Sequence, residues 1–364
     1  MVATQPTFNV IFQELAVTAI QRMQRGIVIM VLDDDTNADL DKVTYTGLGD
    51  VKKADFTADN FNLLTLAFMG NPFKVVVIKA EEEIADTLAK LDYFNNYILC
   101  YPKAGADDFT AIQNYLKKVR GKNNYSKAIL GNALSPDAEY IVNFATTDIK
   151  ANVNGEVKTL TAGDYTARIA GALSGLSASR SLTFFELPEI VECPLSQDED
   201  ADVEDGKLIV IHQDGSFKLG RAVNSLVTLG DGVTEAFQKI RVMDIMDTIA
   251  NDIVSTFRLY YVGKYTNNFT NKNRFVGAIN AYLATLAAEG LLEAENVNKV
   301  YISAEKVKLY LQGKGVDTTN MTTKELERAN TGSRVLLDGT CSPTDAMEDL
   351  SLNMYLFQAL EQVA

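Results

Sequence analysis

The chain has 364 residues, of which 47% are hydrophobic and 23% charged, and its net charge at pH 7 is −14. This composition is typical of a globular protein with a sizeable core, and the acidic balance argues against general affinity for nucleic acid. We find no apolar run of the roughly 18 residues that a membrane span needs, and no signal-peptide pattern at the N-terminus. Three widely spaced cysteines predict reduced thiols in a cytoplasm rather than disulfides or a metal site.

Apolar residues at every second position near the N-terminus predict a strand. They are Phe8, Val10 and Phe12, and a period of two is typical of a strand. A lone strand cannot pair with itself, so it must join a sheet of its own chain or of another chain. The pattern is equally consistent with an ordinary edge strand of the first domain.

Strands and helices alternate along the next part of the chain. The apolar patterns predict strands at 27–32, 74–78, 97–101, 127–130 and 140–145, and helices at 82–91 and 107–120. A further helix, capped by Thr57, is predicted to contain the apolar residues from Phe61 to Phe68. Such alternation is typical of a parallel sheet covered by helices. Further on, Asn154-Gly155 and Asp214-Gly215 predict two hairpins. The Ala- and Gly-rich stretch at 163–176 predicts a helix whose backbone can pack closely against a neighbour.

Two long amphipathic helices are predicted in the C-terminal half. After a turn at Gly230-Asp231-Gly232, apolar residues from Phe237 to Tyr260 recur at three- and four-residue steps. This spacing predicts a helix of about seven turns. A second helix carries apolar residues from Phe275 to Leu286 and ends at Gly290. Both helices need a larger body to pack on, so we interpret them as framework.

A last set of apolar residues at every second position predicts a strand at 349–357. Its members are Leu350, Leu352, Met354 and Leu356. Short strands at 300–302 and 335–337 and short helices at 304–311 and 324–329 are predicted before it. Like the N-terminal strand, this one has edges that a strand from another subunit can complete, main chain to main chain.

No stretch carries a convincing catalytic, metal or cofactor motif. His212, the single histidine, lies at the end of a predicted hairpin strand, where a bond to backbone or water is its ordinary role. Gly47-Leu48-Gly49 lacks the rest of a phosphate-binding loop, and the acidic runs at 33–35 and 198–205 lack the spacing of a calcium loop, so we interpret them as solvated loops. We predict no enzyme; an α/β hydrolytic enzyme with an unidentified carboxylate site is the alternative hypothesis.

Several segments resemble the contractile tail sheath proteins of myophages, including the compact sheaths of PBSX-like defective prophages and R-type tail bacteriocins. The residues that carry the resemblance lie at 20–28, Gly220–Leu226, Gly230–Gly232 and Lys239–Asp244, and the resemblance covers nearly the whole chain. It implies a mixed α/β and α+β fold whose core is subtilisin-like in fold but has no protease site.

The resemblance also implies a division of the chain. The expected parts are an N-terminal arm at 1–25, a small β-rich domain at 26–90, an α/β subtilisin-like domain at 91–235, a C-terminal sheath domain with the long helices at 236–345, and a C-terminal strand arm at 346–364. On this interpretation the strands at 7–13 and 350–357 link neighbouring subunits.

The function implied by the resemblance is structural. Copies of the chain would polymerise into hexameric rings around a tail tube and contract to drive the tube through a cell envelope. The implied partners are further copies, the tail tube protein, and baseplate and terminator proteins, without nucleic acid, membrane insertion or cofactor. The implied location is the tail of a virion or tail-like particle assembled in a bacterial cytoplasm. Basic residues expected to face the tube or a neighbour are Arg22, Arg25, Lys272 and Arg274.

Overall fold

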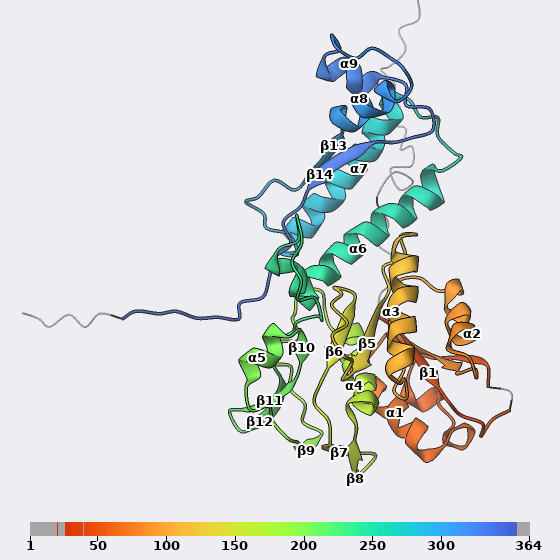
Figure 1. The fold of residues 1–364 in the computed structure, drawn as a ribbon, viewed down its shortest axis with the longest axis vertical. Helices are drawn as coiled ribbons and strands as arrows, with labels where there is room; N and C mark the ends of the chain where they lie inside the picture. The colour runs from red at the N-terminus through yellow and green to blue at the C-terminus, as the bar shows by residue number, and fades with distance from the viewer. Residues whose placement is uncertain (1–19, 21–25, 39, 355–364) are drawn as a thin grey trace, which may run out of the picture.

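A seven-stranded sheet lies in the lower half of the computed structural model as drawn in Figure 1, and the model describes residues 20, 26–38 and 40–354. Its strands are, in spatial order, β10 (Lys207–Leu208), β6 (Ile141–Phe144), β5 (Lys127–Gly131), β4 (Ile98–Cys100), β1 (Ile27–Leu32), β3 (Lys74–Lys79) and β2 (Lys42–Tyr45). Neighbours pair in parallel except β2, which is antiparallel to β3. Counted along the chain, the first five parallel strands follow the doubly wound order 2-1-3-4-5.

Helices cover both faces of this sheet. Helices α1 (Ala58–Phe68) and α4 (Ala162–Gly175) share one apolar core with Val28 and Met30 of β1. Helices α2 (Ile84–Ala89) and α3 (Ala106–Arg120) share the other core with Ile29 and Val31. Because both faces are covered, the central strands are continuously apolar. The predicted alternation of strands and helices is confirmed.

The small residues of α4 allow it to lie directly against α1. A Cβ atom on Gly171 would lie 1.9 Å from the carbonyl oxygen of Ala67, and one on Gly175 would lie 1.9 Å from that of Gly70. Neither position can hold a side chain without moving a backbone. The close packing predicted from the Ala- and Gly-rich sequence is confirmed.

Two smaller β structures extend from the sheet. One has the order β8 (Glu156–Leu160), β7 (Ile149–Val153), β9 (Ile190–Glu192), and the other is the hairpin of β11 (Val210–Gln213) and β12 (Ser216–Leu219). Both predicted hairpin turns form, with positive φ at Asn154-Gly155 and Asp214-Gly215. The acidic run at 198–205, predicted as a loop, contains the short helix α5 (Glu199–Glu204), where Asp198 accepts a hydrogen bond from the Ala201 amide and so caps the helix.

A C-terminal unit is built on the two long helices, α6 (Ile240–Thr256) and α7 (Phe269–Ala288) (Figure 1). Its remaining elements are the two-stranded sheet of β13 (Lys299–Ile302) and β14 (Leu337–Thr340), with helices α8 (Ala304–Gln312) and α9 (Thr323–Arg328). The first long helix was predicted to be continuous from Phe237 to Tyr260. In the structure α6 begins at Ile240 and passes into a π-helical turn at Phe257–Tyr261.

Two further predictions differ from the structure. The boundary expected at residues 90 and 91 falls inside the large sheet, because β1 pairs with β4 across it. Such pairing joins strands that are distant in sequence, so local patterns do not reveal it. The strand expected at 335–337 forms later, as β14 at Leu337–Thr340, because its register with β13 is set by the pairing of Ile302 with Leu337.

Candidate functional site

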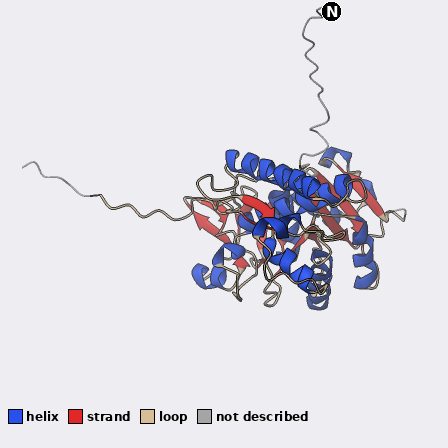
Figure 2. Cartoon of the chain, turned by 90° about the horizontal axis from the view of Figure 1, so that it is seen from above, coloured by secondary structure: helices blue, strands red, loops and turns tan. Residues whose placement is uncertain are grey.

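The C-terminal segment leaves the body of the molecule as an extended chain (Figures 1 and 2). Leu350, Leu352 and Met354 are 89%, 68% and 86% exposed. Residues 349–354 are assigned to neither helix nor strand, so the described part of the predicted strand is not formed within this chain. Alternating apolar side chains that stay exposed to water mark a segment suited to pairing with a partner.

The chain just before this segment is held firmly by Glu348, whose side chain is 6% exposed. One carboxylate oxygen accepts a hydrogen bond from the Thr183 hydroxyl at 2.6 Å. The other lies 2.6 Å from Lys239 Nζ and 3.4 Å from the Arg221 guanidinium. We call Thr183, Arg221, Lys239 and Glu348 the arm anchor. It joins the C-terminal segment to the α/β unit and to the start of α6.

The residues of the segment that precede Glu348 are held by contacts of their main chain. Pro343 bridges to Leu292, and the Thr344 amide donates to the Leu291 carbonyl at 3.0 Å. The Arg241 guanidinium donates to the Thr344 carbonyl and to its hydroxyl. We call residues 342–349 the arm root. The segment is therefore fixed up to Asp349 and extends away from the body beyond it.

A second charged cluster joins α6 to the α/β unit. The Arg120 guanidinium contacts the Asp247 carboxylate at 2.7 Å, and Lys127 Nζ contacts Asp244 at 2.5 Å and Asp247 at 3.2 Å. Burial lowers the pKa of Lys127, but the two carboxylates outweigh it and hold that pKa above its ordinary value. We call these four residues the junction cluster.

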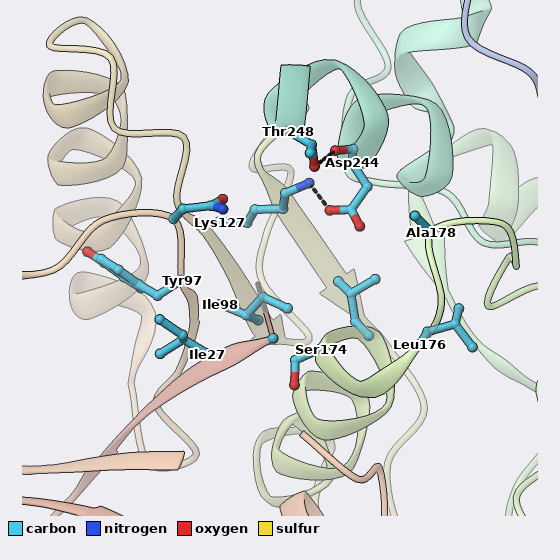
Figure 3. Close-up of a pocket in the computed structure, with 12 residues that line it drawn as sticks. Ile27, Tyr97, Ile98, Lys127, Ser174, Leu176, Ala178, Asp244 and Thr248 are labelled. Atoms are coloured by element: carbon cyan, nitrogen blue, oxygen red, sulfur yellow. Dashed lines mark hydrogen bonds and ion pairs between the residues drawn. The ribbon is translucent and has the colours of Figure 1, made fainter. Parts of the chain in front are cut away.

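A cavity of about 240 Å³ lies beside the junction cluster (Figure 3). It is lined by the starts of β1 and β4, the end of α4 and one side of α6. Lys127 faces this cavity but stays charged, because it is paired with Asp244 and its pKa is raised. The Ser174 hydroxyl, also in the lining, donates to the Gly171 carbonyl of its own helix. The cavity therefore offers neither a free amine nor a serine paired with a base.

The contacts of the other polar residues singled out from the sequence are those of structural residues. His212 lies exposed on the β11–β12 hairpin with its ring 4.8 Å from that of Phe217. Asp34 is buried rather than solvated, as had been predicted for its acidic run, because it accepts hydrogen bonds from Thr57 and Asn60 of α1. These bonds outweigh burial and lower the pKa of Asp34. Among the described residues, no group of His, Cys, Asp or Glu side chains is placed to hold a metal ion.

Of the predicted basic contact residues, the structure describes two. Arg274 is exposed, with its guanidinium 5.8 Å from the centre of the Tyr265 ring. Lys272 is buried, donates to the Ala329 carbonyl at 3.1 Å and has its pKa lowered by burial. It does not lie on the surface of the subunit, where the prediction placed it. The remaining predicted contact residues, which are Phe8, Val10, Phe12, Arg22, Arg25 and Leu356, lie outside the described part of the chain.

The arm anchor was missed by sequence reasoning. Its partners are more than 100 residues away from Glu348 in sequence, and none belongs to a local motif. The available signal was weak: Arg221 and Lys239 flank an apolar stretch in an acidic chain, which indicates that a carboxylate from elsewhere pairs with them. None of the described helices is long and apolar enough to span a membrane.

The sequence of this chain is similar to those of proteins in a known family. Residues 233–357 match the family described as the phage tail sheath C-terminal domain. The tail sheath protein of Clostridium phage phiCD119 is 33% identical over 362 residues, which cover 96% of this chain and 98% of that protein. This similarity extends well beyond the matched domain and includes the α/β unit.

Solved structures show the same fold. The crystal structure of the sheath tail protein from Desulfitobacterium hafniense superposes with a TM-score of 0.67 at 17% identity, covering 81% of this chain and 93% of that one. The helical sheath of the anti-feeding prophage in its contracted state gives 0.69 at 14% identity, covering 97% and 99%. Given these folds and the identity to the phiCD119 protein along nearly its whole length, the chain belongs to the phage tail sheath protein family.

Proposed function

We propose that this protein is the structural subunit of a contractile tail sheath, polymerising into stacked hexameric rings around a tail tube. Contraction of the sheath drives the tube through the target envelope. Membership of the tail sheath family supports this role, as does likeness to a helical sheath solved in its contracted state. The partners in this proposal are further copies, the tube protein, and baseplate and terminator proteins of a virion tail or tail-like particle.

The observation that carries the proposal is the exposed, alternating segment beyond the arm anchor. An extended strand that is rooted at one end and unpaired along its apolar side chains can complete the sheet of a neighbour. Several main-chain hydrogen bonds then form together, so the link is strong although the bodies it joins can move. The N-terminal arm, with Phe8, Val10 and Phe12, has the same role in this proposal.

We place the acceptor for an incoming strand at the outer edge of β14. A two-stranded sheet is marginal by itself and gains from further strands, and β13 and β14 form such a sheet. Asn280 of α7 binds the main chain of β13, since its side chain accepts from the Val300 amide at 2.7 Å and donates to the Val300 carbonyl at 3.0 Å. Asn280 therefore occupies the outer edge of β13, which leaves the outer edge of β14 for the incoming strand.

The same proposal assigns no catalytic role to the chain. The described α/β unit serves as a subtilisin-like core without a protease site, supported by its parallel strands with helices on both faces. The exposed hairpin position of His212 agrees with a structural role. We retain the division into arms and a C-terminal sheath domain at 236–345 as part of this proposal.

Electron microscopy of the purified protein tests the assembly. We expect the full chain to form tubes or ring stacks at high protein concentration, nucleated by tail tube protein where required. A variant carrying Leu350→Asp and Leu352→Asp is expected to remain monomeric, because a carboxylate at each position opposes burial of the strand between sheets. A chain without residues 1–13 is expected to behave likewise.

The matched control is Leu134→Asp, which changes a leucine that is 94% exposed on the α/β unit. This variant should assemble as the unaltered chain does. Tubes formed equally well by the arm variant and by the control would refute strand exchange through residues 350–354. Failure of the unaltered chain to assemble, even with tube protein present, would refute the sheath role itself.

A further inference from the structure

An aromatic groove of about 480 Å³ lies between the π turn after α6 and the first half of α7. Three ring contacts define it: Phe257 with Phe275 at 5.1 Å, Tyr261 with Phe275 at 4.6 Å, and Tyr261 with Tyr265 at 5.3 Å between ring centres. Val262, on its rim, is 55% exposed. Tyr261 and Phe275 are each only 5% exposed, and polar residues of the lining, such as Asn267 and Asn271, form another side of the groove. The half-buried rings of Phe257 and Tyr265, together with Val262, are the part that a further apolar element can cover.

The π turn helps to create this groove. In a π turn the hydrogen bonds span five residues, and such turns in α-helices occur frequently at functional sites. Here the turn at Phe257–Tyr261 holds its first and last rings nearly parallel, 6.1 Å apart and 14° from coplanar. Both rings line the groove, so the local distortion of the helix serves the groove directly.

Ile20 indicates which part of the chain lies next to the groove. It is the one residue before Gly26 that the structure describes, and it is 8% exposed. It belongs to the apolar cluster that includes Ile249 of α6 together with Tyr261 and Phe275 of the groove. The chain preceding Ile20 therefore starts from the same cluster that lines the groove.

The sequence before Ile20 has the pattern of a short amphipathic helix. Phe12, Leu15, Ala16 and Ala19 fall on one face with Ile20, at spacings of three and four residues. The opposite face carries Glu14 and Thr18, with Val17 beside them, and Gln13 lies next to Ile20 at the border between the faces. Eight helical residues span about 12 Å, which is also the distance along α6 from Ile249 to Phe257 at about 1.5 Å per residue.

We propose that residues 12–19 dock along α6 into the aromatic groove of their own chain, with the apolar face toward the rings. This is the packing of an amphipathic helix in a groove with an aromatic side. It fixes the root of the N-terminal arm on the C-terminal unit. On this inference Phe12 packs within its own chain, and the exchanged strand of the arm is left with Phe8 and Val10. The inference concerns contacts within one subunit, so it stands whether or not the arms exchange.

Fluorescence provides the test, because the chain contains no tryptophan. Val262→Trp places a single reporter on the exposed rim of the groove. In the full chain, at a concentration where it is monomeric, we expect blue-shifted emission and low quenching by acrylamide. Adding Leu15→Asp and Ala16→Asp should shift the emission to the red and raise the quenching constant at least twofold, to the level of a reporter chain without residues 1–19.

The matched control carries Val17→Asp and Thr18→Asp, which add the same two charges to the opposite side of the segment. Its emission should equal that of the reporter chain. All these variants keep Ile20, and far-ultraviolet circular dichroism checks that they fold. An emission spectrum that is unchanged both by the Leu15 and Ala16 substitutions and by removal of residues 1–19 would overturn the proposal.

A mixing experiment identifies the chain that fills the groove. The reporter chain without residues 1–19 is mixed with an excess of the unaltered, tryptophan-free protein. We expect its red-shifted emission to persist, because the groove of each chain is filled by its own segment. Recovery of the blue shift on mixing would show that a second copy supplies the segment, and this would overturn docking within one chain.

Discussion

Glu348 and Asp349 are adjacent carboxylates with very different surroundings. Asp349 pairs with Arg221 at 2.5 Å, but its side chain is 77% exposed, and solvent screens an exposed pair of this kind so that it contributes little to stability. Glu348 is 6% exposed and is shared among a hydroxyl and two cations. Loss of a buried partner costs more, because the groups left behind have given up their water. The position of the arm therefore depends on Glu348.

We predict that Glu348→Gln loosens the arm root. The amide keeps the shape of the side chain but removes the charge facing Lys239 and Arg221, at a cost of about 1–3 kcal/mol. Hydrogen exchange of the amides at 342–349 should become faster by roughly tenfold or more, while that of the β1 amides stays unchanged. Asp349→Asn is the control and should change the exchange of the same amides little. Equal effects of the two substitutions would contradict the importance assigned to Glu348.

Elements whose formation depends on neighbouring residues could be predicted from the sequence. Asn154-Gly155 and Asp214-Gly215 specify their hairpins by turn chemistry, and the helix α1 begins after Thr57, which caps it as expected. Elements that depend on distant contacts could not be predicted. The described part of the strand predicted at 349–357, which is residues 349–354, has no partner strand within the described chain to reveal its register. The pairing of β1 with β4 merges two parts of the chain that looked separate.

In the candidate site, too, the features set by neighbouring residues could be predicted and those set by distant contacts could not. Alternation of Leu350, Leu352 and Met354 predicts their exposed, extended arrangement before pairing, because that pattern is local. The arm anchor could not be predicted, since it requires knowledge of which loop brings Thr183 beside Lys239. The prediction that Lys272 lies on the surface was wrong for a related reason. Its side chain on α7 faces inward, toward the Ala329 carbonyl.

At the contact of α1 with α4, we predict that Gly171→Ala is destabilising by about 1–3 kcal/mol, the range for overpacking. The added methyl group would lie 1.9 Å from the Ala67 carbonyl oxygen, so one backbone must move. Gly277→Ala in α7 provides the matched control, because a Cβ atom there meets nothing within 4 Å. It should raise stability by about 0.5–1 kcal/mol through helix propensity. Urea denaturation measures both, and a loss of stability at Gly277 equal to that at Gly171 would count against the packing argument.

The described part of the chain consists of an α/β unit and a C-terminal unit, and two charged sites are among the contacts between them, together with Ile240 of α6, which packs in the α/β core, and Arg258, which donates to the Lys122 carbonyl. The junction cluster joins α6 to α3 and β5, and the arm anchor joins the arm root to both units. Buried charged pairs of this kind hold a specific geometry, because each group needs its partner. In the proposed sheath, they are the places where the two units can change their relative orientation while each core stays intact.

We predict that Asp247→Asn lowers the free energy of unfolding by about 3–5 kcal/mol, the usual cost of removing one partner from a buried ion pair. Asp35→Asn is the control; that carboxylate pairs with Lys79 but its side chain is 86% exposed, so its loss of stability should be small beside that of Asp247→Asn. The raised pKa of Lys127 keeps its share of the stabilisation complete below the ordinary value of 10.5, and it is lost as pH rises through the raised pKa. The difference between the variants should therefore be constant from about pH 6 to 9 in urea titrations; similar losses for both substitutions would contradict it.

The path of the arm root determines how a subunit carries tension. A pull on the chain beyond residue 350 reaches the body at Glu348, which holds Thr183 of the α/β unit and Lys239 beside α6. The pulling force is shared by both units at once, so it pulls them toward each other and does not separate them. Behind this point the main chain pairs with Leu292 at Pro343 and with Leu291 at Thr344. In the proposed sheath, each subunit would therefore act as a tie whose point of attachment lies directly next to a section held by both units.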